Sequence, residues 1–317
     1  MTYKFLIISI FLLTFSFEYN TFEASNLKTT SDYPNLNYDA SQPITTFNVE
    51  MIKYYSWFGS YGYCRDEQIA SGTCCKSKKL LTNWEIVSHK SVKQIFSFSY
   101  NWVLLKSDKY KKFIIAVPGT REKFQLVLEA IGSALDDYKD DKKIRISHYF
   151  LALYNMFNND LFSASNLREI RNHPDYQVIV TGHSLGGALA SIISFAIKKE
   201  NLFTNDVVLI TYGQPRTGNY YFAEYVTNNV NKIFRIVKKG DIVVTIPLHT
   251  PLFKEFTYYH IGGMIVLNKE MNEFTQCEYY NFEDHSGICK YEGNLDFETY
   301  HCKYFSPNIS FPKRCEV

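Results

Sequence analysis

YQVIVTGHSLGGALA, at residues 176–190, is the stretch that decides the fold. Residues 176–181 form a short run of apolar and β-branched side chains, which predicts a buried strand. Residues 185–199 are rich in Ala, Leu and Ile and predict a helix that follows directly. Between them, residues 182–186 fit the pattern G-x-S-x-G. A strand, a glycine turn, a serine and a helix, in this order, are typical of a nucleophile elbow, which holds Ser184 at the helix N-terminus.

The rest of the chain alternates apolar strand-like runs with helical patterns. Further strands are predicted at 84–87, 92–100, 102–107, 113–117, 207–212, 233–237 and 258–267. Helices are predicted at 47–63, 121–135 and 150–172, with a cysteine-bearing loop at 64–79 and a charged loop at 136–143. Because the central strands are solid apolar runs, both faces of their sheet must be covered. The sequence therefore predicts an α/β fold with a mostly parallel central sheet and helices on both faces.

The pattern of the N-terminal residues predicts that the protein is exported from the cytoplasm. Lys4 precedes the mostly apolar residues 5–17, which are too few for a membrane span of roughly 20 apolar residues. Residues 1–24 are therefore predicted to be a secretory signal peptide, with a signal anchor as the weaker alternative. Residues 25–46 are polar and predict a leader or pro-segment, and residues 47–317 predict a single domain. No other stretch approaches spanning length, so no transmembrane span is expected in the mature chain.

The composition argues against nucleic acid and metal ions as binding partners of this protein. The formal net charge of the 317 residues is only +2, and no basic stripe is present, which argues against nucleic-acid binding. The seven cysteines cluster towards the two ends of the chain and, in an oxidising compartment, favour disulfides over metal ligation. No C-x-x-C or H-x-x-x-H pair occurs, so no metal site is expected. Asn308 opens a glycosylation sequon, which fits a secreted surface.

A serine hydroxyl needs a base to act as a nucleophile, and the base needs a carboxylate that orients it. Asp241 follows a predicted strand, where a loop carboxylate can reach the elbow, whereas Asp206 precedes its strand and lies at the wrong end. The histidines after Ser184 are His249, His260, His285 and His301. His260 sits in an apolar run and is more typical of a core histidine, but the residues alone leave His260 and His301 open as the base.

An oxyanion also needs donors. The N–H of Leu185, the residue after the nucleophile, is one such donor. The loop at residues 118–120 follows an early strand, and its Gly119-Thr120 could supply a second donor. An ordinary helix cap by Thr120 is the structural alternative.

Several segments together resemble the fungal-type (class 3) lipases, which are α/β-hydrolases that cleave acylglycerols and related esters. The resemblance covers about residues 49–315. It is carried by the elbow at 181–190, the strand and loop at 115–120, the Gly-Gln-Pro-Arg segment at 212–219, the segments at 235–237 and 241–243, and His301-x-x-Tyr304-Phe305. Departures from the family pattern are Pro118, Tyr149, Thr245 and Tyr300, none of which removes a catalytic atom.

The resemblance implies a role for each residue. Ser184 would be the nucleophile, Asp241 the orienting carboxylate and His301 the base, with Thr120 and Leu185 as the oxyanion hole. It also implies a Cys277–Cys289 disulfide, a Cys64–Cys315 disulfide and a helical lid at residues 121–135. A helix that is docked on the core is the alternative to the lid.

These observations predict a secreted serine carboxylic ester hydrolase, a triacylglycerol or acylglycerol lipase that acts on a lipid or ester at an oil–water or membrane interface. No cofactor is needed for this chemistry. Within enzymes, the alternatives are a phospholipase A1 and a feruloyl-type esterase, because fold does not fix substrate. A silent lipid-binding relative is the alternative from another class. The protein is expected outside the cell or retained in a secretory or digestive compartment.

Overall fold

The protein is described here by a computed structural model. The structure describes residues 21–23, 38–64, 66–71, 73–74, 77–93, 99–119, 134–249, 254–271, 273–277, 279, 289, 293–294, 296–305 and 311.

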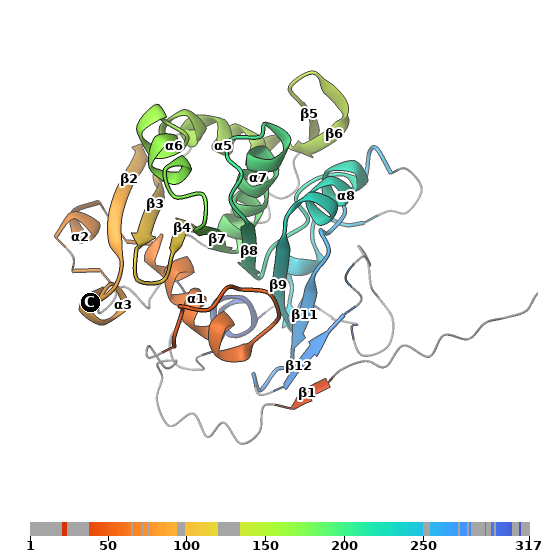
Figure 1. Ribbon diagram of the computed structural model, residues 1–317. Helices are drawn as coiled ribbons and strands as arrows, with labels where there is room; N and C mark the ends of the chain where they lie inside the picture. Colours follow the sequence, from red (N-terminus) through yellow and green to blue (C-terminus); the bar gives the residue numbers. More distant parts are fainter. Residues whose placement is uncertain are drawn as a thin grey trace, which may run out of the picture.

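A nine-stranded sheet forms the centre of the described part of the chain (Figure 1). Its order is β1-β12-β11-β9-β8-β7-β4-β3-β2. The strands are β1 (Thr21–Glu23), β2 (Glu85–Lys93), β3 (Ser99–Ser107), β4 (Lys112–Val117), β7 (Gln177–His183), β8 (Val207–Tyr212), β9 (Lys232–Lys238), β11 (Met264–Leu267) and β12 (Glu273–Gln276). The five strands from β11 to β4 run parallel, and antiparallel strands flank them on both sides. The predicted mostly parallel sheet is confirmed.

The parallel strands bury both of their faces, and the side chains alternate between two cores. In β4, Phe113 and Ile115 join the core under α5 (His148–Leu161), α7 (Leu185–Lys199) and α8 (Tyr220–Asn229), while Ile114 and Ala116 join the core under α1 (Val49–Tyr61). Figure 1 shows α1 on one side of the sheet and α5, α7 and α8 on the other. Helices therefore cover both faces, as predicted.

Smaller elements complete the described chain. They are α2 (Asp66–Ala70), α3 (Ser77–Leu80), α6 (Ala164–Arg171), the 3₁₀ turn η1 (Val243–Thr245), the π-helical turn η3 (Glu298–Cys302), and the strand pairs β5 (Leu135–Tyr138) with β6 (Asp141–Ser147) and β10 (Gly240–Asp241) with β13 (Gly293–Asn294). No helix in the described ranges combines the length and the apolar character that a membrane crossing requires.

The predicted elements differ from the structure in four regions. The helix expected at 150–172 is broken after Leu161, because Ser163 caps α6 and the Asn166 side chain binds the carbonyls of Asp160 and Leu161. The charged loop expected at 136–143 is the β5–β6 hairpin. The three strands expected between 84 and 107 are the two longer strands β2 and β3. Of the strand expected at 258–267, only β11 forms.

Part of the predicted leader packs on the domain. Ala40 and Ile44 are buried. The Lys112 ammonium donates to the carbonyls of Ala40 at 2.6 Å and Gln42 at 2.9 Å, and the Gln177 side chain bonds the backbone of Ile44. Residues 38–46 are therefore docked against the amino ends of β4 and β7. Strand β1, inside the range predicted as a signal peptide, pairs with β12.

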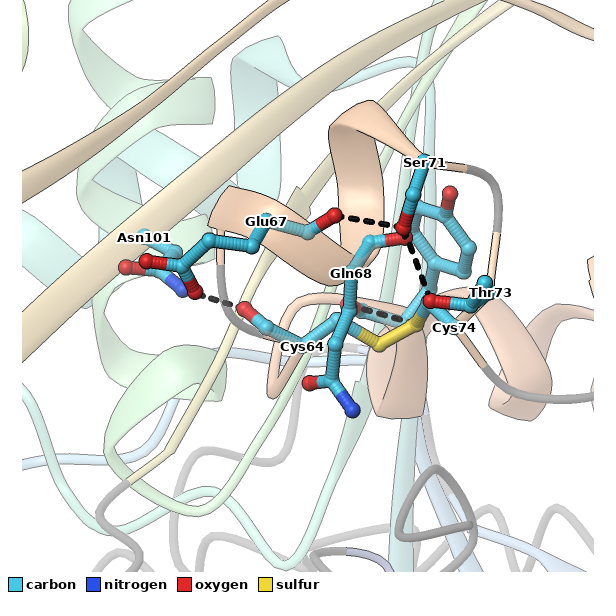
Figure 2. The surroundings of a disulfide bond; sticks show 8 residues. Cys64, Glu67, Gln68, Ser71, Thr73, Cys74 and Asn101 are labelled. Atoms are coloured by element: carbon cyan, nitrogen blue, oxygen red, sulfur yellow. Dashed lines mark hydrogen bonds between the residues drawn. A yellow bond between two sulfur atoms is a disulfide. The ribbon is translucent and has the colours of Figure 1, made fainter.

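The disulfide predictions have different outcomes. The Cys277–Cys289 disulfide is confirmed, with an S–S distance of 2.07 Å. The Cys64–Cys315 pairing is wrong, because Cys64 is bonded to Cys74. The chain turns back through α2 after α1 ends, so the Cα atoms of Cys64 and Cys74 lie 5.8 Å apart, within disulfide reach. Figure 2 shows this bridge beside Asn101 of β3, whose side chain donates to the Cys64 carbonyl.

Candidate active site

Ser184 lies on the predicted elbow between β7 and α7. Its φ of 59° and ψ of −127° are a strained conformation for a residue with a side chain. The turn is tight because glycines flank it: a Cβ on Gly182 would lie 2.2 Å from the Gly186 carbonyl oxygen. A Cβ on Gly186 would lie 2.3 Å from the Val117 carbonyl oxygen, at the end of β4. The Ser184 N–H donates to the Tyr212 carbonyl at 2.8 Å, which fixes the turn against β8.

The N-terminus of α7 supplies the first oxyanion candidate. Leu185 is the first residue of α7, so its N–H has no acceptor within the helix. The loop after β4 also reaches the elbow, since a Cβ on Gly119 would lie 3.0 Å from the Ser184 Cβ. Thr120, the second predicted donor, lies outside the described residues, as does the predicted lid at 121–135 except for its last two positions.

Asp241 and His301 form a buried pair. Each is 1% exposed, and the His301 Nδ1 lies 2.9 Å from both carboxylate oxygens of Asp241. Because an ionised carboxylate only accepts hydrogen bonds, Nδ1 carries the proton and donates a hydrogen bond to Asp241. The other ring nitrogen, Nε2, is buried and has no hydrogen-bond partner within the described part of the chain. The imidazole is therefore held in the tautomer whose Nε2 can accept a proton.

Two further donors hold the Asp241 carboxylate. The backbone N–H of Val243 donates to Oδ1 at 2.9 Å, and the Tyr304 hydroxyl donates to Oδ2 at 2.7 Å. Burial, and next the charge of Asp241, raise the pKa of Tyr304 well above its usual value. Tyr304 therefore stays a neutral donor, and each carboxylate oxygen has a partner besides His301.

The pair is also placed next to the elbow. The His183 Nε2 lies 2.9 Å from the His301 carbonyl oxygen, to which it donates, and the two rings are 4.6 Å apart. The His183 Nδ1 is 2.8 Å from the hydroxyl of Tyr63, next to the Cys64–Cys74 disulfide. Gly213, with φ +58°, lets β8 approach: a Cβ there would lie 2.8 Å from the Asp241 Oδ2 and 3.0 Å from the His301 Nδ1.

The alternative residues lie elsewhere. His260 is buried, and its Nε2 binds the Val244 carbonyl at 2.8 Å, in agreement with a core histidine. The His249 Nδ1 binds the Tyr258 carbonyl, and His285 lies outside the described residues. Asp206 binds Asn231 at the opposite end of the strands.

Sequence reasoning missed the residues that support this pair. In the sequence, Tyr304 belongs to the H-x-x-Y-F motif and His183 occupies a variable position of the G-x-S-x-G pattern. The H-x-x-Y spacing could have suggested Tyr304, because it puts a hydroxyl three residues after the histidine. No local pattern marks Tyr63, whose contact with His183 joins positions 120 residues apart.

A strained serine between a parallel strand and a buried helix is typical of the α/β-hydrolase fold, and the residue before this serine binds the turn of a buried carboxylate–imidazole pair. Residues 114–250 match the class 3 lipase family. The chain resembles this family over these residues, and a solved lipase structure shares its fold.

Three relatives illustrate the similarity. A lipase from Rhizopus niveus is 31% identical over 208 residues, which are 64% of this chain and 51% of the relative. A secreted mono- and diacylglycerol lipase from Fusarium solani is 40% identical over 108 residues, 33% of this chain and 32% of the relative. The crystal structure of a lipase from Rhizopus microsporus var. chinensis superposes with a TM-score of 0.67 at 25% identity, covering 86% of this chain and 94% of that one. The chain thus spans about half the length of the first curated relatives that it matches.

Proposed function

We propose that the protein is a secreted serine carboxylic ester hydrolase that cleaves acylglycerols. The observation that carries the proposal is the buried Asp241–His301 pair, whose Nε2 has no hydrogen-bond partner among the described residues, beside the strained Ser184. A buried acceptor nitrogen with no partner is costly unless it has a task, and accepting the serine proton is such a task.

In the proposed reaction, the Ser184 Oγ attacks the ester carbonyl carbon while its proton passes to the His301 Nε2. The carbonyl oxygen becomes an oxyanion that the N–H of Leu185, together with Thr120, stabilises. The intermediate collapses, the alcohol leaves with the proton from His301, and an acyl-enzyme remains. Water then attacks the acyl-enzyme with His301 again as the base, which releases the fatty acid and restores Ser184. Asp241 keeps its charge throughout and stabilises the imidazolium.

The lipid substrate and secretion are supported by similarity and by chemistry. The Rhizopus relative is named a lipase and the Fusarium relative a secreted mono- and diacylglycerol lipase. The Cys64–Cys74 and Cys277–Cys289 disulfides fit an oxidising compartment. An oil–water or membrane interface is the expected place of action, because long-chain acylglycerols gather there.

Labelling with a fluorophosphonate tests the proposal. The wild type should be labelled once, at Ser184, and should hydrolyse tri- and diacylglycerol emulsions. Ser184→Ala should lose labelling and roughly 10⁶-fold in kcat, because removing the nucleophile of a triad leaves only residual catalysis. Ser191→Ala, a buried serine of α7, is the matched control and should keep both. A wild type that binds lipid but is not labelled would support the silent relative, and hydrolysis of phospholipid alone would support a phospholipase A1.

A further inference from the structure

A buried lysine binds the turn that carries His301. Lys238 is the last residue of β9, and only 2% of it is exposed. Its ammonium donates to the carbonyl of Thr299 at 2.9 Å and to the carbonyl of Lys303 at 3.0 Å. These two carbonyls stand two residues before and two residues after His301, in and just beyond η3. A cation on the carbonyl end of a helical turn is favourable, and bonds from a charged donor are the stronger ones.

The backbone of the same lysine binds the other half of the pair. The Lys238 N–H donates to the Tyr304 hydroxyl at 3.0 Å, and that hydroxyl donates to the Asp241 Oδ2 at 2.7 Å. Lys238 therefore reaches His301 through its side chain and Asp241 through its main chain. The ring of Tyr300, the residue before His301, lies 5.6 Å from the Lys238 ammonium and packs where Gly240, at φ +98°, leaves room.

We propose that Lys238 is a positioning residue for the proposed triad, whose charged side chain holds the His301 turn in the position that the proposed proton transfer from Ser184 requires. The inference rests on the proposed function, because positioning matters only if His301 is the base. Lys238 touches no reacting atom. Its effect is geometric, and a misplacement of about 1 Å at a reacting group can cost on the order of 100-fold in rate.

The charge of Lys238 is sensitive to pH near the range in which the protein would work. Burial lowers its pKa from 10.5 to about 8, although the charge of Asp241 opposes the change. The other charged or titratable groups around it are Lys303, Asp296, Glu270, Tyr300 and Tyr304. Above pH 8 the neutral amine still donates, but its bonds to the two carbonyls lose the strength that the charge provides.

The contribution of Lys238 to folding stability rises with pH, although its bonds to the two carbonyls weaken. Because the folded-state pKa is depressed, the unfolded chain binds more protons between about pH 8 and 10.5, so the contribution of Lys238 to the unfolding free energy rises with pH there. A loss of activity above pH 8 through Lys238 would therefore occur without loss of stability at this group. A merely structural lysine would not produce that combination.

The test compares Lys238→Met with Lys112→Met. Lys112 is an equally buried lysine that donates to backbone carbonyls at the opposite end of the sheet. Each variant is measured for kcat and KM on a soluble ester from pH 6 to 10. The proton on the His301 Nδ1 is followed by NMR, because its downfield resonance reports the bond to Asp241 without any substrate. Lys238→Met should lose on the order of 100-fold in kcat with KM nearly unchanged, and its Nδ1 proton should move or broaden.

Lys112→Met should keep kcat and the Nδ1 resonance. The wild type should lose kcat with a midpoint near pH 8, and Lys238→Met should not show this limb. A folded Lys238→Met with wild-type kcat and resonance would overturn the proposal. If Lys238→Met does not fold, the wild type decides. An Nδ1 proton resonance of His301 that is unchanged from pH 7 to 9.5 overturns the proposal, and a shift of this resonance centred near pH 8 supports it. A wild type that hydrolyses no ester refutes the proposed function, while the resonance still tests Lys238.

Discussion

The carboxyl and amino ends of the central strands carry the same residue types but use them for different purposes. At the carboxyl ends of the strands, Asp241 accepts from Tyr304 and His301, and Lys238 binds the chain around them. At the amino ends, Asp206 accepts from Asn231, and Lys112 binds the carbonyls of Ala40 and Gln42. Lys112 is buried like Asp241 and Lys238, whereas Asp206 is exposed, and the bonds at the two ends are of the same kinds.

The difference lies in what is left over. At the amino ends the polar side chains tie down backbone, and the buried atom left without a partner there, within the described ranges, is an amide oxygen, the Asn205 Oδ1, which does not take up a proton near neutral pH. At the carboxyl ends they converge on one imidazole, and the His301 Nε2 is left without a partner among the described residues. The comparison teaches that a polar cluster indicates chemistry when the cluster orients a titratable atom that it does not itself satisfy. Three pairs of substitutions can test this contrast, and each pair places one substitution at the carboxyl ends of the strands and one at the amino ends.

The aspartates should differ most. Asp241→Asn keeps the shape of the side chain but favours the wrong His301 tautomer, so kcat should fall roughly 10⁴-fold. Asp206→Asn should leave kcat unchanged, because its partner Asn231 belongs to the opposite end. Ester hydrolysis by both purified variants, with circular dichroism as a check on folding, gives the answer. Equal losses in the two variants would mean that the contrast between the ends does not reflect catalysis.

The elbow and the parallel strands could be predicted from sequence because each is a local pattern. Strand β8 and helix α7 have the predicted bounds, since a buried parallel strand is a continuous apolar run and the glycines at 182 and 186 mark the turn. The resemblance to a known family, rather than the residues alone, favoured His301 over His260, and the structure brings His301 to Asp241.

The rest depends on contacts that no local pattern encodes. The break between α5 and α6 is set by Asn166, whose side chain reaches back to Asp160 and Leu161. The Cys64–Cys74 disulfide depends on how the chain returns after α1, and a count of cysteines allows many pairings. The sequence assigns Lys238 no role beyond following the strand predicted at 233–237, because its acceptors lie more than 60 residues further along the chain.

The tyrosines should show a smaller contrast. Tyr304→Phe leaves the Asp241 Oδ2 without its hydroxyl donor and the Lys238 N–H without its acceptor, which should cost about 1–3 kcal/mol of stability and about tenfold in kcat. Tyr176→Phe at the amino ends removes a hydroxyl that donates to Asp108 at 2.9 Å, but that carboxylate is largely exposed and water can replace the donor.

Urea unfolding and steady-state kinetics on the two tyrosine variants measure both effects. Tyr176→Phe should cost less than about 1 kcal/mol and nothing in kcat. A Tyr304→Phe variant with full activity would show that Val243 and His301 alone orient the Asp241 carboxylate.

Lys112 gives the smallest effect and the finest test, because it is expected to matter for stability alone. Burial lowers the pKa of Lys112 from 10.5 to about 8, with the charge of Asp39 in opposition. Between these values the unfolded chain binds the extra proton, so the unfolding free energy should rise with pH from about 8 to 10.5 and be flat in this contribution below 8. Lys112→Met should lose about 1–3 kcal/mol at pH 7, because the carbonyls of Ala40 and Gln42 lose their donor, and should show a shallower rise above pH 8. Urea unfolding at pH 7, 8, 9 and 10 measures both quantities, and residues 38–46 should become sensitive to protease in the variant. If the unfolding free energy rises with pH equally steeply above pH 8 in the wild type and in Lys112→Met, the Lys112 ammonium is not desolvated as its burial implies. Lys112 would then not be a buried lysine comparable to Lys238 at the other end of the sheet.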